Sequence, residues 1–272
     1  MAESPAGIAG VFDRAAETYD AVGVPWFQPI AQGLVRELAV RPGERILDIG
    51  CGRGAALMPL AAATGPGGSV LGIDLAPRMV ELTARDAEYL PQVTVQVADA
   101  SAPNLPASSF DLIASCLVLF FLPEPGAAVR VWAELLVPGG RMGVTTFGEQ
   151  DERWKRIDAI FAPYLPQRML DARTSGSTGP FASDAGMEEL YRNAGLVDVR
   201  TVHDEVQAVF RGPEHLVDFT WSHGQRAMWE SVPAGERDAV RTELIASTRE
   251  FQLNSGALTL TQEVRHTLGR RP

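Results

Sequence analysis

The sequence has 272 residues, of which 46% are hydrophobic and 21% are charged, and its formal net charge is −10. This balance is typical of a globular protein with enough apolar residues for a sizeable core, while the negative charge argues against a nucleic-acid partner. No apolar run approaches the ~20 residues that a membrane-spanning helix needs, so no membrane partner is expected.

The beginning of the chain and its cysteines bear on the cellular compartment. Residues 1–8 lack the basic region and the apolar region of a signal peptide. The two cysteines, Cys51 and Cys116, are too few for the disulfide framework of a secreted protein of this length. The sequence therefore predicts a cytoplasmic location.

Helical and strand-like segments alternate through the first half of the chain. Residues 1–40 are predicted to form N-terminal lid helices, because apolar side chains recur at helical spacing over 11–19 and 26–40. Residues 41–148 are predicted to form a cofactor-binding core in which short apolar runs alternate with helices, the pattern of a parallel sheet buried on both sides. The predicted strands are 45–49, 69–73, 93–97, 110–115 and 141–147, and the helices between them are 53–63, 77–90 and 127–136.

The second half of the chain alternates less regularly. Residues 149–183 and 212–256 are predicted to be cap segments on the substrate side, and the latter segment looks helical. Residues 184–211 and 257–272 are predicted to supply a further helix and the last two strands. The chain is therefore expected to be a single α/β domain with a Rossmann-like, seven-stranded, mostly parallel sheet, helices on both faces and helical cap insertions.

A glycine-rich turn follows the first predicted strand and opens a helix, in the stretch Asp48-Ile49-Gly50-Cys51-Gly52-Arg53-Gly54. Glycines let the backbone turn tightly and approach a ligand closely, and a helix N-terminus offers unpaired N–H groups. The spacing Gly50-x-Gly52-x-x-Ala55 also satisfies the dinucleotide fingerprint. On this motif alone, a nicotinamide-dependent oxidoreductase therefore stays open.

Acidic residues stand near the ends of the first three predicted strands. Asp74 ends the second strand, where it can accept hydrogen bonds from a ribose diol, and Asp99 follows the third. Asp48 precedes the glycine turn, where its charge would repel a pyrophosphate and attract an ammonium or sulfonium group. Because ligands of open α/β sheets bind at the carboxyl ends of the strands, the sequence predicts an electronegative crevice for a cationic nucleoside.

In this order and spacing, the motifs resemble the class I S-adenosylmethionine-dependent methyltransferases, in particular the ubiquinone/menaquinone methyltransferase-like group and its natural-product relatives. The resemblance covers residues 11–147 and includes the stretch Leu136-Val137-Pro138-Gly139-Gly140. It implies that the protein binds S-adenosyl-L-methionine, releases S-adenosyl-L-homocysteine and methylates O, N or C of a small molecule. Aromatic residues outside the predicted strands favour a hydrophobic or aromatic acceptor in an apolar pocket.

The resemblance also implies where parts of the cofactor bind. The glycine turn would hold the methionine end, the acid after the second strand would hold the ribose, and the residues after the third strand would read the adenine edge. A tyrosine from the lid would close over the site. The implied cofactor-binding residues are Tyr19, Asp48, Gly50, Cys51, Gly52, Asp74, Leu75, Met79, Asp99, Ala100, Ser115 and Phe120.

One position departs from the family pattern. Relatives often carry histidine after the fourth strand, in a Leu-His-His-Leu context, whereas here the stretch reads Leu119-Phe120-Phe121-Leu122. A phenylalanine cannot accept a proton, so no general base is expected from this position. A cofactor-binding protein with non-methylating, cyclase-like chemistry is therefore kept as an alternative.

The candidates for a general base elsewhere are the histidines, namely His203, His215, His223 and His266. His223 is predicted to be the catalytic one, because it lies in a helical insertion of the kind that walls the substrate pocket in this fold. The histidines and cysteines have no metal-ligand spacing, so no metal is expected. A small-molecule acceptor is the expected partner, and a homodimer stays open.

Overall fold

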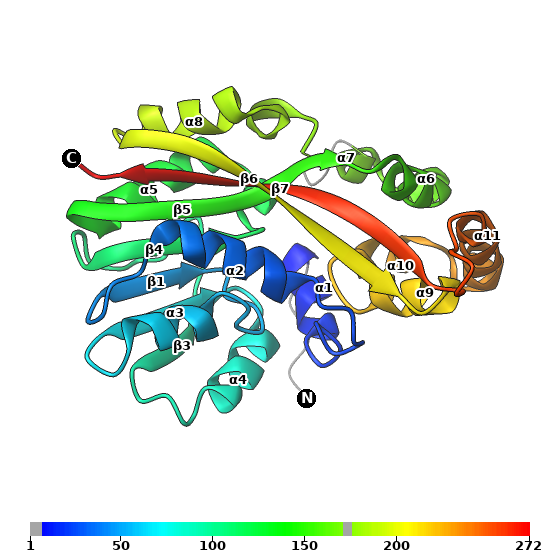
Figure 1. The fold of residues 1–272 in the computed structure, drawn as a ribbon, viewed down its shortest axis with the longest axis horizontal. Coiled ribbons are helices and arrows are strands. Elements are labelled where there is room, and N and C mark those ends of the chain that lie inside the picture. Colours follow the sequence, from blue (N-terminus) through cyan, green and yellow to red (C-terminus); the bar gives the residue numbers. More distant parts are fainter. Residues whose placement is uncertain (1–6, 171–175) are drawn as a thin grey trace.

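The computed structural model describes residues 7–170 and 176–272. The first residues of the predicted lid, 1–6, and residues 171–175 of the predicted cap segment 149–183 lie outside the described residues. The described chain forms a seven-stranded sheet in the order β3-β2-β1-β4-β5-β7-β6 (Figure 1). The strands are β1 (Arg45–Ile49), β2 (Ser69–Asp74), β3 (Val93–Val97), β4 (Phe110–Cys116), β5 (Leu136–Gln150), β6 (Val197–Phe210) and β7 (Leu258–Arg270).

The pairing of the strands confirms the predicted fold class. Strands β1 to β5 pair in parallel, and β7 runs antiparallel between β5 and β6. Strand β5 begins five residues before the predicted one, because Leu136 pairs with Phe110 across an irregularity in the β4–β5 register. All carboxyl ends of β1 to β4 therefore meet at one edge of the sheet, where a doubly wound fold binds its ligands.

Helices cover both faces of the sheet. Helices α2 (Phe27–Leu38) and α3 (Leu57–Thr64) bury Leu34 and Leu57 in a cluster with residues of β1, β2 and β4. Helices α5 (Pro125–Leu135) and α8 (Asp184–Asn193) contribute to the cluster on the opposite face. Apolar side chains packed from two sides explain why the central strands are apolar throughout. Helix α4 (Pro77–Asp86) packs beside β2 and β3.

The last three strands extend past the central sheet and carry a helical cap (Figure 1). The cap contains α6 (Glu152–Phe161) and α7 (Gln167–Leu170), which follow β5. It also contains α9 (Pro213–Trp221), α10 (Arg226–Ser231) and α11 (Arg237–Arg249), which connect β6 to β7. Helix α11 packs on α6 and α9. In the described segments, no helix is long and apolar enough to cross a membrane.

The N-terminal helix α1 (Gly7–Ala15) lies between the central sheet and the cap (Figure 1). The Asp13 carboxylate accepts from the backbone N–H of Arg78 at the start of α4 (2.8 Å). Arg14 donates through Nε to Glu230 of α10 (2.9 Å). The helix ends at Ala15, earlier than predicted, because residues 16–20 form turns instead of continuing it.

Candidate active site

The turn between β1 and α3 has three glycines in the left-handed backbone conformation, with φ angles of 71° at Gly50, 47° at Gly52 and 84° at Gly54. Glycine adopts these angles without the steric penalty that a side chain brings. A Cβ atom on Gly50 would also lie 2.2 Å from the Val118 side chain. The backbone N–H of Gly50 donates to the carbonyl oxygen of Ile73 (2.7 Å), which fixes the turn against the end of β2.

Two carboxylates lie behind this turn. Asp74 accepts from the backbone N–H groups of Gly52 and Ala76, each at 2.9 Å. Asp48 is 1% exposed, and its Oδ2 has no hydrogen-bond partner within the described part of the chain. Burial raises the pKa of both carboxyls, to about 7 for Asp48, where the charge of Asp74 adds to the rise. Such poorly compensated negative charge favours a cationic ligand nearby.

A cavity of about 120 Å³ opens at the carboxyl ends of the first strands, and we call it the smaller cavity. Its wall is formed by the glycine turn, by the residues after β2, β3 and β4, and by the lid. It brings together these residues of the predicted cofactor-binding set: Tyr19, Gly50, Gly52, Asp74, Leu75, Met79, Asp99 and Ala100. Asp99 is exposed, and its Oδ1 accepts from the backbone N–H of Ser101 (2.7 Å).

Three residues of the predicted set are buried behind this wall and do not line it. Asp48 and Cys51 lie within and beneath the glycine turn, with exposed fractions of 1% and 5%. Ser115 on β4 is fully buried, and its hydroxyl donates to the carbonyl oxygen of Ile49 (3.0 Å). In this arrangement Ser115 connects two neighbouring strands.

Phe120 lines a different, larger cavity. The backbone at Leu117 has φ 60, and the 3-10 helix η1 (Leu119–Phe121) begins two residues later. This turn directs Phe120 toward Phe147, on which its ring stacks with centroids 5.5 Å apart. Phe121 lines both cavities. The turn after β4 therefore lines both cavities through Leu117 and Phe121, whereas Phe120, which was predicted to bind the cofactor, lines only the larger one.

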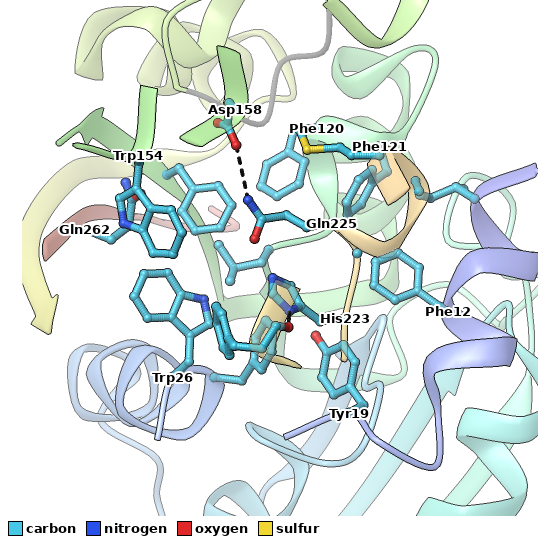
Figure 2. A pocket seen from close by; sticks show the side chains of 18 of the residues that line it. Phe12, Tyr19, Trp26, Phe120, Phe121, Trp154, Asp158, His223, Gln225 and Gln262 are labelled. Atoms are coloured by element: carbon cyan, nitrogen blue, oxygen red, sulfur yellow. Dashed lines mark hydrogen bonds between the residues drawn. The ribbon is translucent and has the colours of Figure 1, made fainter. Parts of the chain in front are cut away.

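The larger cavity, of about 520 Å³, lies between the lid, the end of β4 and the cap (Figure 2). This volume is within the ~300–1,000 Å³ typical of small-molecule pockets. Its wall is mainly aromatic, with rings from Phe12, Tyr19, Trp26, Phe27, Phe120, Phe121, Phe147, Trp154 and Phe219. The two cavities share the wall residues Ile8, Phe12, Tyr19, Leu117 and Phe121, so they adjoin at the lid.

His223 lines the larger cavity and lies two residues after the end of α9. Its Nδ1 lies 2.7 Å from the carbonyl oxygen of Phe219, which can only accept, so Nδ1 carries the proton. The neutral ring therefore has its lone pair on Nε2. Burial among aromatic side chains lowers the pKa of His223 to about 4, which keeps the ring in the proton-accepting form at neutral pH.

The other three histidines have different surroundings, and none of them is among the described residues that line the two cavities. His203 is exposed on β6 and pairs with Asp184 (2.8 Å). His215 accepts from the backbone N–H of Arg211 (3.1 Å), and its Nε2 donates to a carbonyl oxygen of the lid segment (2.7 Å). His266 is buried on β7 with Nδ1 2.9 Å from Thr145 Oγ1. Their bonding is structural.

Sequence reasoning missed a polar cluster in the wall of the larger cavity. Asp158 on α6 accepts from Gln150 Nε2 (2.7 Å) and from Gln225 Nε2 (3.2 Å). Burial raises the pKa of Asp158 to about 6, although both amide hydrogen bonds oppose the rise. One signal was present in the sequence, because Asp158 follows Trp154 by four residues and so lies on the buried face of an amphipathic helix.

Comparison with known proteins assigns the family. Residues 46–140 match the methyltransferase-domain family. The chain is 36% identical over 272 residues to nocamycin O-methyltransferase of Saccharothrix syringae, an alignment that covers 96% of this chain and 97% of that protein. The chain belongs to the class I S-adenosylmethionine-dependent methyltransferases. This membership confirms the predicted family and excludes the nicotinamide-dependent oxidoreductase that the glycine motif left open.

Two further methyltransferases are similar to this one. Aklanonic acid methyltransferase DauC of Streptomyces sp. (strain C5) is 38% identical over 166 residues, which cover 60% of this chain and 76% of that protein. A solved structure of phosphoethanolamine N-methyltransferase 2 of Haemonchus contortus superposes with a TM-score of 0.60 at 14% identity, over 98% of this chain and 61% of that chain. At this identity the superposition shows the fold alone.

The smaller cavity of the methyltransferase has features that fit the family's cofactor. A Cβ atom on Gly52 would meet no described atom within 4 Å, so open space lies directly beside the turn. The Asp74 carboxylate lines this cavity and the unpartnered Asp48 oxygen is buried behind its wall, so their negative charge would favour a cationic ligand there. Met79 and Leu75 offer apolar surface to a planar base. Among the residues described, no group of three or more His, Cys, Asp and Glu side chains could hold a metal ion.

Proposed function

We propose that this methyltransferase moves the methyl group of S-adenosyl-L-methionine to an oxygen of a small hydrophobic or aromatic metabolite, with His223 as general base. The observation that carries the proposal is the common wall of an acid-lined cavity and an aromatic cavity, formed by Ile8, Phe12, Tyr19, Leu117 and Phe121. Oxygen as the acceptor atom is supported by nocamycin O-methyltransferase, which aligns with nearly the whole chain. The cofactor is supported by the Haemonchus contortus enzyme, whose structure holds S-adenosylhomocysteine.

The residues that would hold the cofactor are those of the smaller cavity. Gly50 and Gly52 would take the methionine end, Asp74 the ribose hydroxyls and Asp99 the adenine edge. When bound, the cofactor supplies a methyl group on a positively charged sulfur. The buried charges of Asp48 and Asp74 would favour this cation over its neutral product.

The residues of the larger cavity would align the acceptor, exclude water and receive its proton. Alignment of two reactants in a closed site is worth ~7–11 kcal/mol of the activation barrier, and a positioned general base adds about 10²–10⁴ in rate for a neutral hydroxyl. The carbonyl oxygen of Phe219 holds the proton on Nδ1 of His223, so the acceptor's proton would move to Nε2.

The proposal is tested in two steps with the purified protein. Titration calorimetry with S-adenosyl-L-homocysteine should detect binding that Asp74→Asn weakens. Incubation with methyl-labelled S-adenosyl-L-methionine and a panel of polycyclic phenols should then place the label on an oxygen, as identified by mass spectrometry and NMR. Absence of S-adenosyl-L-homocysteine binding, or label found only on carbon or nitrogen, would contradict the proposal. Binding with a persistent lack of transfer would favour the cyclase-like alternative.

A further inference from the structure

We propose that Gln225 acts with His223 to accept the hydrogen bond of the acceptor's reacting O–H group, and that Asp158 and Gln150 hold Gln225 in the orientation that this requires. The inference rests on the proposed function and deepens it. It defines the acceptor as a molecule whose reacting oxygen still carries a proton when it binds.

The orientation of Gln225 follows from the chemistry of Asp158. An ionised carboxylate can only accept hydrogen bonds, so the atom of Gln225 that faces Asp158 Oδ1 at 3.2 Å must be the amide nitrogen. The other carboxylate oxygen is taken by Gln150 Nε2 at 2.7 Å. The amide oxygen of Gln225 therefore points away from Asp158. Figure 2 shows it directed toward His223.

The two groups that face each other are both hydrogen-bond acceptors. His223 donates from Nδ1 to Phe219, so its Nε2 offers only a lone pair. The Oε1 atom of Gln225 is buried and has no hydrogen-bond partner in the part of the chain that the structure describes. A protonated His223 would satisfy Gln225, and hydrogen bonding to Gln225 does favour that form, but burial outweighs it and lowers the pKa to about 4.

A buried acceptor without a donor keeps the full cost of having lost its hydrogen bonds to water, and native structures rarely keep one without a reason. A ligand O–H group between Gln225 and His223 would remove this cost. A carboxylate or a methyl ether brings only lone pairs to the same position and would leave the Gln225 oxygen without a donor.

The same arrangement accounts for the chemical step. As the O–H bond of the acceptor breaks, its proton goes to Nε2 of His223, and the oxygen forms the bond to the methyl carbon. The carbon–sulfur bond breaks with its electron pair on sulfur, which becomes neutral. The imidazolium that results lies next to the Gln225 oxygen, with the Asp158 carboxylate behind it. The methylated product has no donor for Gln225, so we expect it to bind more weakly than the acceptor.

The test uses 2-naphthol as the donor probe, with 2-methoxynaphthalene and naphthalene as probes that cannot donate from oxygen. Affinities are measured by equilibrium dialysis at pH 7.5 with saturating S-adenosyl-L-homocysteine. We expect the wild-type protein to prefer 2-naphthol over 2-methoxynaphthalene by at least about tenfold. Gln225→Met keeps the side-chain length but removes the amide, and it should reduce the preference to about threefold or less.

Gln225→Glu is the matched control, because it restores an acceptor oxygen beside His223 and can share a proton with Asp158. We expect it to keep most of the preference that Gln225→Met loses, a rescue that a purely structural role of Gln225 does not predict. Thermal unfolding of both variants monitors the fold. Equal wild-type affinities for 2-naphthol and 2-methoxynaphthalene, including no binding of either, would overturn the inference. A preference unchanged in Gln225→Met would overturn it as well.

The measurement also separates this inference from the proposed function. If S-adenosyl-L-homocysteine binds but the probes show no preference, the role of Gln225 is wrong while the proposed function stands. If S-adenosyl-L-homocysteine does not bind, both are wrong.

Discussion

Replacing His223 by glutamine gives the sharpest test of the proposed chemistry. Among the histidines of the described chain it alone lines the larger cavity, so its loss leaves no imidazole to take the acceptor's proton. Loss of a positioned base costs about 10²–10⁴ in rate, which corresponds to ~2.7–5.4 kcal/mol of transition-state stabilisation at about 1.36 kcal/mol per tenfold. The assay is single-turnover transfer of labelled methyl to 2-naphthol at saturating acceptor.

The pH dependence of the same reaction tests the state of His223. Because burial lowers the pKa of His223 to about 4, the neutral, accepting ring predominates at every pH well above 4. The ratio of the wild-type rate to the His223→Gln rate should therefore stay nearly constant from pH 8 down to pH 5.5, since both proteins share the titration of Asp158. With an unperturbed histidine, this ratio would halve near pH 6.5. The deficit of His223→Gln should shrink above the pKa of 2-naphthol, where the acceptor is already ionised.

His203→Gln is the control, because His203 is exposed on β6 and lies outside both cavities. It should transfer methyl groups at the wild-type rate. A His223→Gln variant that is folded and within about twofold of wild type at pH 7 would refute the reasoning. So would a ratio of wild-type to His223→Gln rates that halves near pH 6.5.

Other perturbations have equally definite outcomes. Gly50→Ala should destabilise the protein by ~2–3 kcal/mol, because a left-handed residue with a side chain costs ~1–2 kcal/mol and its Cβ would meet Val118. At Gly52 an alanine would have the same backbone strain, but its Cβ would point into open space. Gly52→Ala should therefore lower the thermal stability less than Gly50→Ala, yet weaken S-adenosyl-L-homocysteine binding. Asp48→Asn should stabilise the protein at pH 8 by up to ~4 kcal/mol, because folding raises the pKa of Asp48 from 3.8 to about 7 and each unit costs about 1.36 kcal/mol of stability when the carboxyl is ionised. Urea unfolding at a series of pH values should show that this gain vanishes below pH 4, where Asp48 is protonated in both the folded and the unfolded state. Asp158, with a pKa of about 6, should take up a proton as the pH falls from 7 to 5 and become a hydrogen-bond donor, which no longer fixes the amide nitrogen of Gln225 toward it. The preference for 2-naphthol over 2-methoxynaphthalene should therefore be smaller at pH 5 than at pH 7.

The part of the site that sequence predicts is the part built from local structure. The turn after β1 is a strand, a glycine run and a helix within a dozen residues, so its backbone geometry is encoded where it occurs. Asp74 and Asp99 are distant from it in sequence, but each stands at or after the end of a parallel strand. Once the sheet is recognised, its topology alone brings such positions to one edge.

The acceptor side could not be predicted in this way, because it depends on how the cap packs. Gln150, Asp158 and Gln225 come from the end of β5, from α6 and from the entry to α10. Their hydrogen bonds depend on tertiary packing, and no spacing rule links residues 158 and 225. His223 was predicted from its place in the insertion, but the tautomer that makes it a base comes from the Phe219 carbonyl, which only the turn at the end of α9 brings close.

The wall between the cavities limits what else could take the methyl group. The residues that line both cavities are apolar except for the hydroxyl of Tyr19, so this wall offers few hydrogen bonds to water. In such a site of low polarity, charges interact strongly. Cys116 lines the smaller cavity and would be a better nucleophile than any hydroxyl as a thiolate. Burial raises its pKa to about 12, so it stays a thiol at neutral pH. The same burial keeps His223 neutral. A low-polarity site thus holds the base in its active form and the competing nucleophile in its inert form, which directs methyl transfer to an acceptor whose proton His223 can remove.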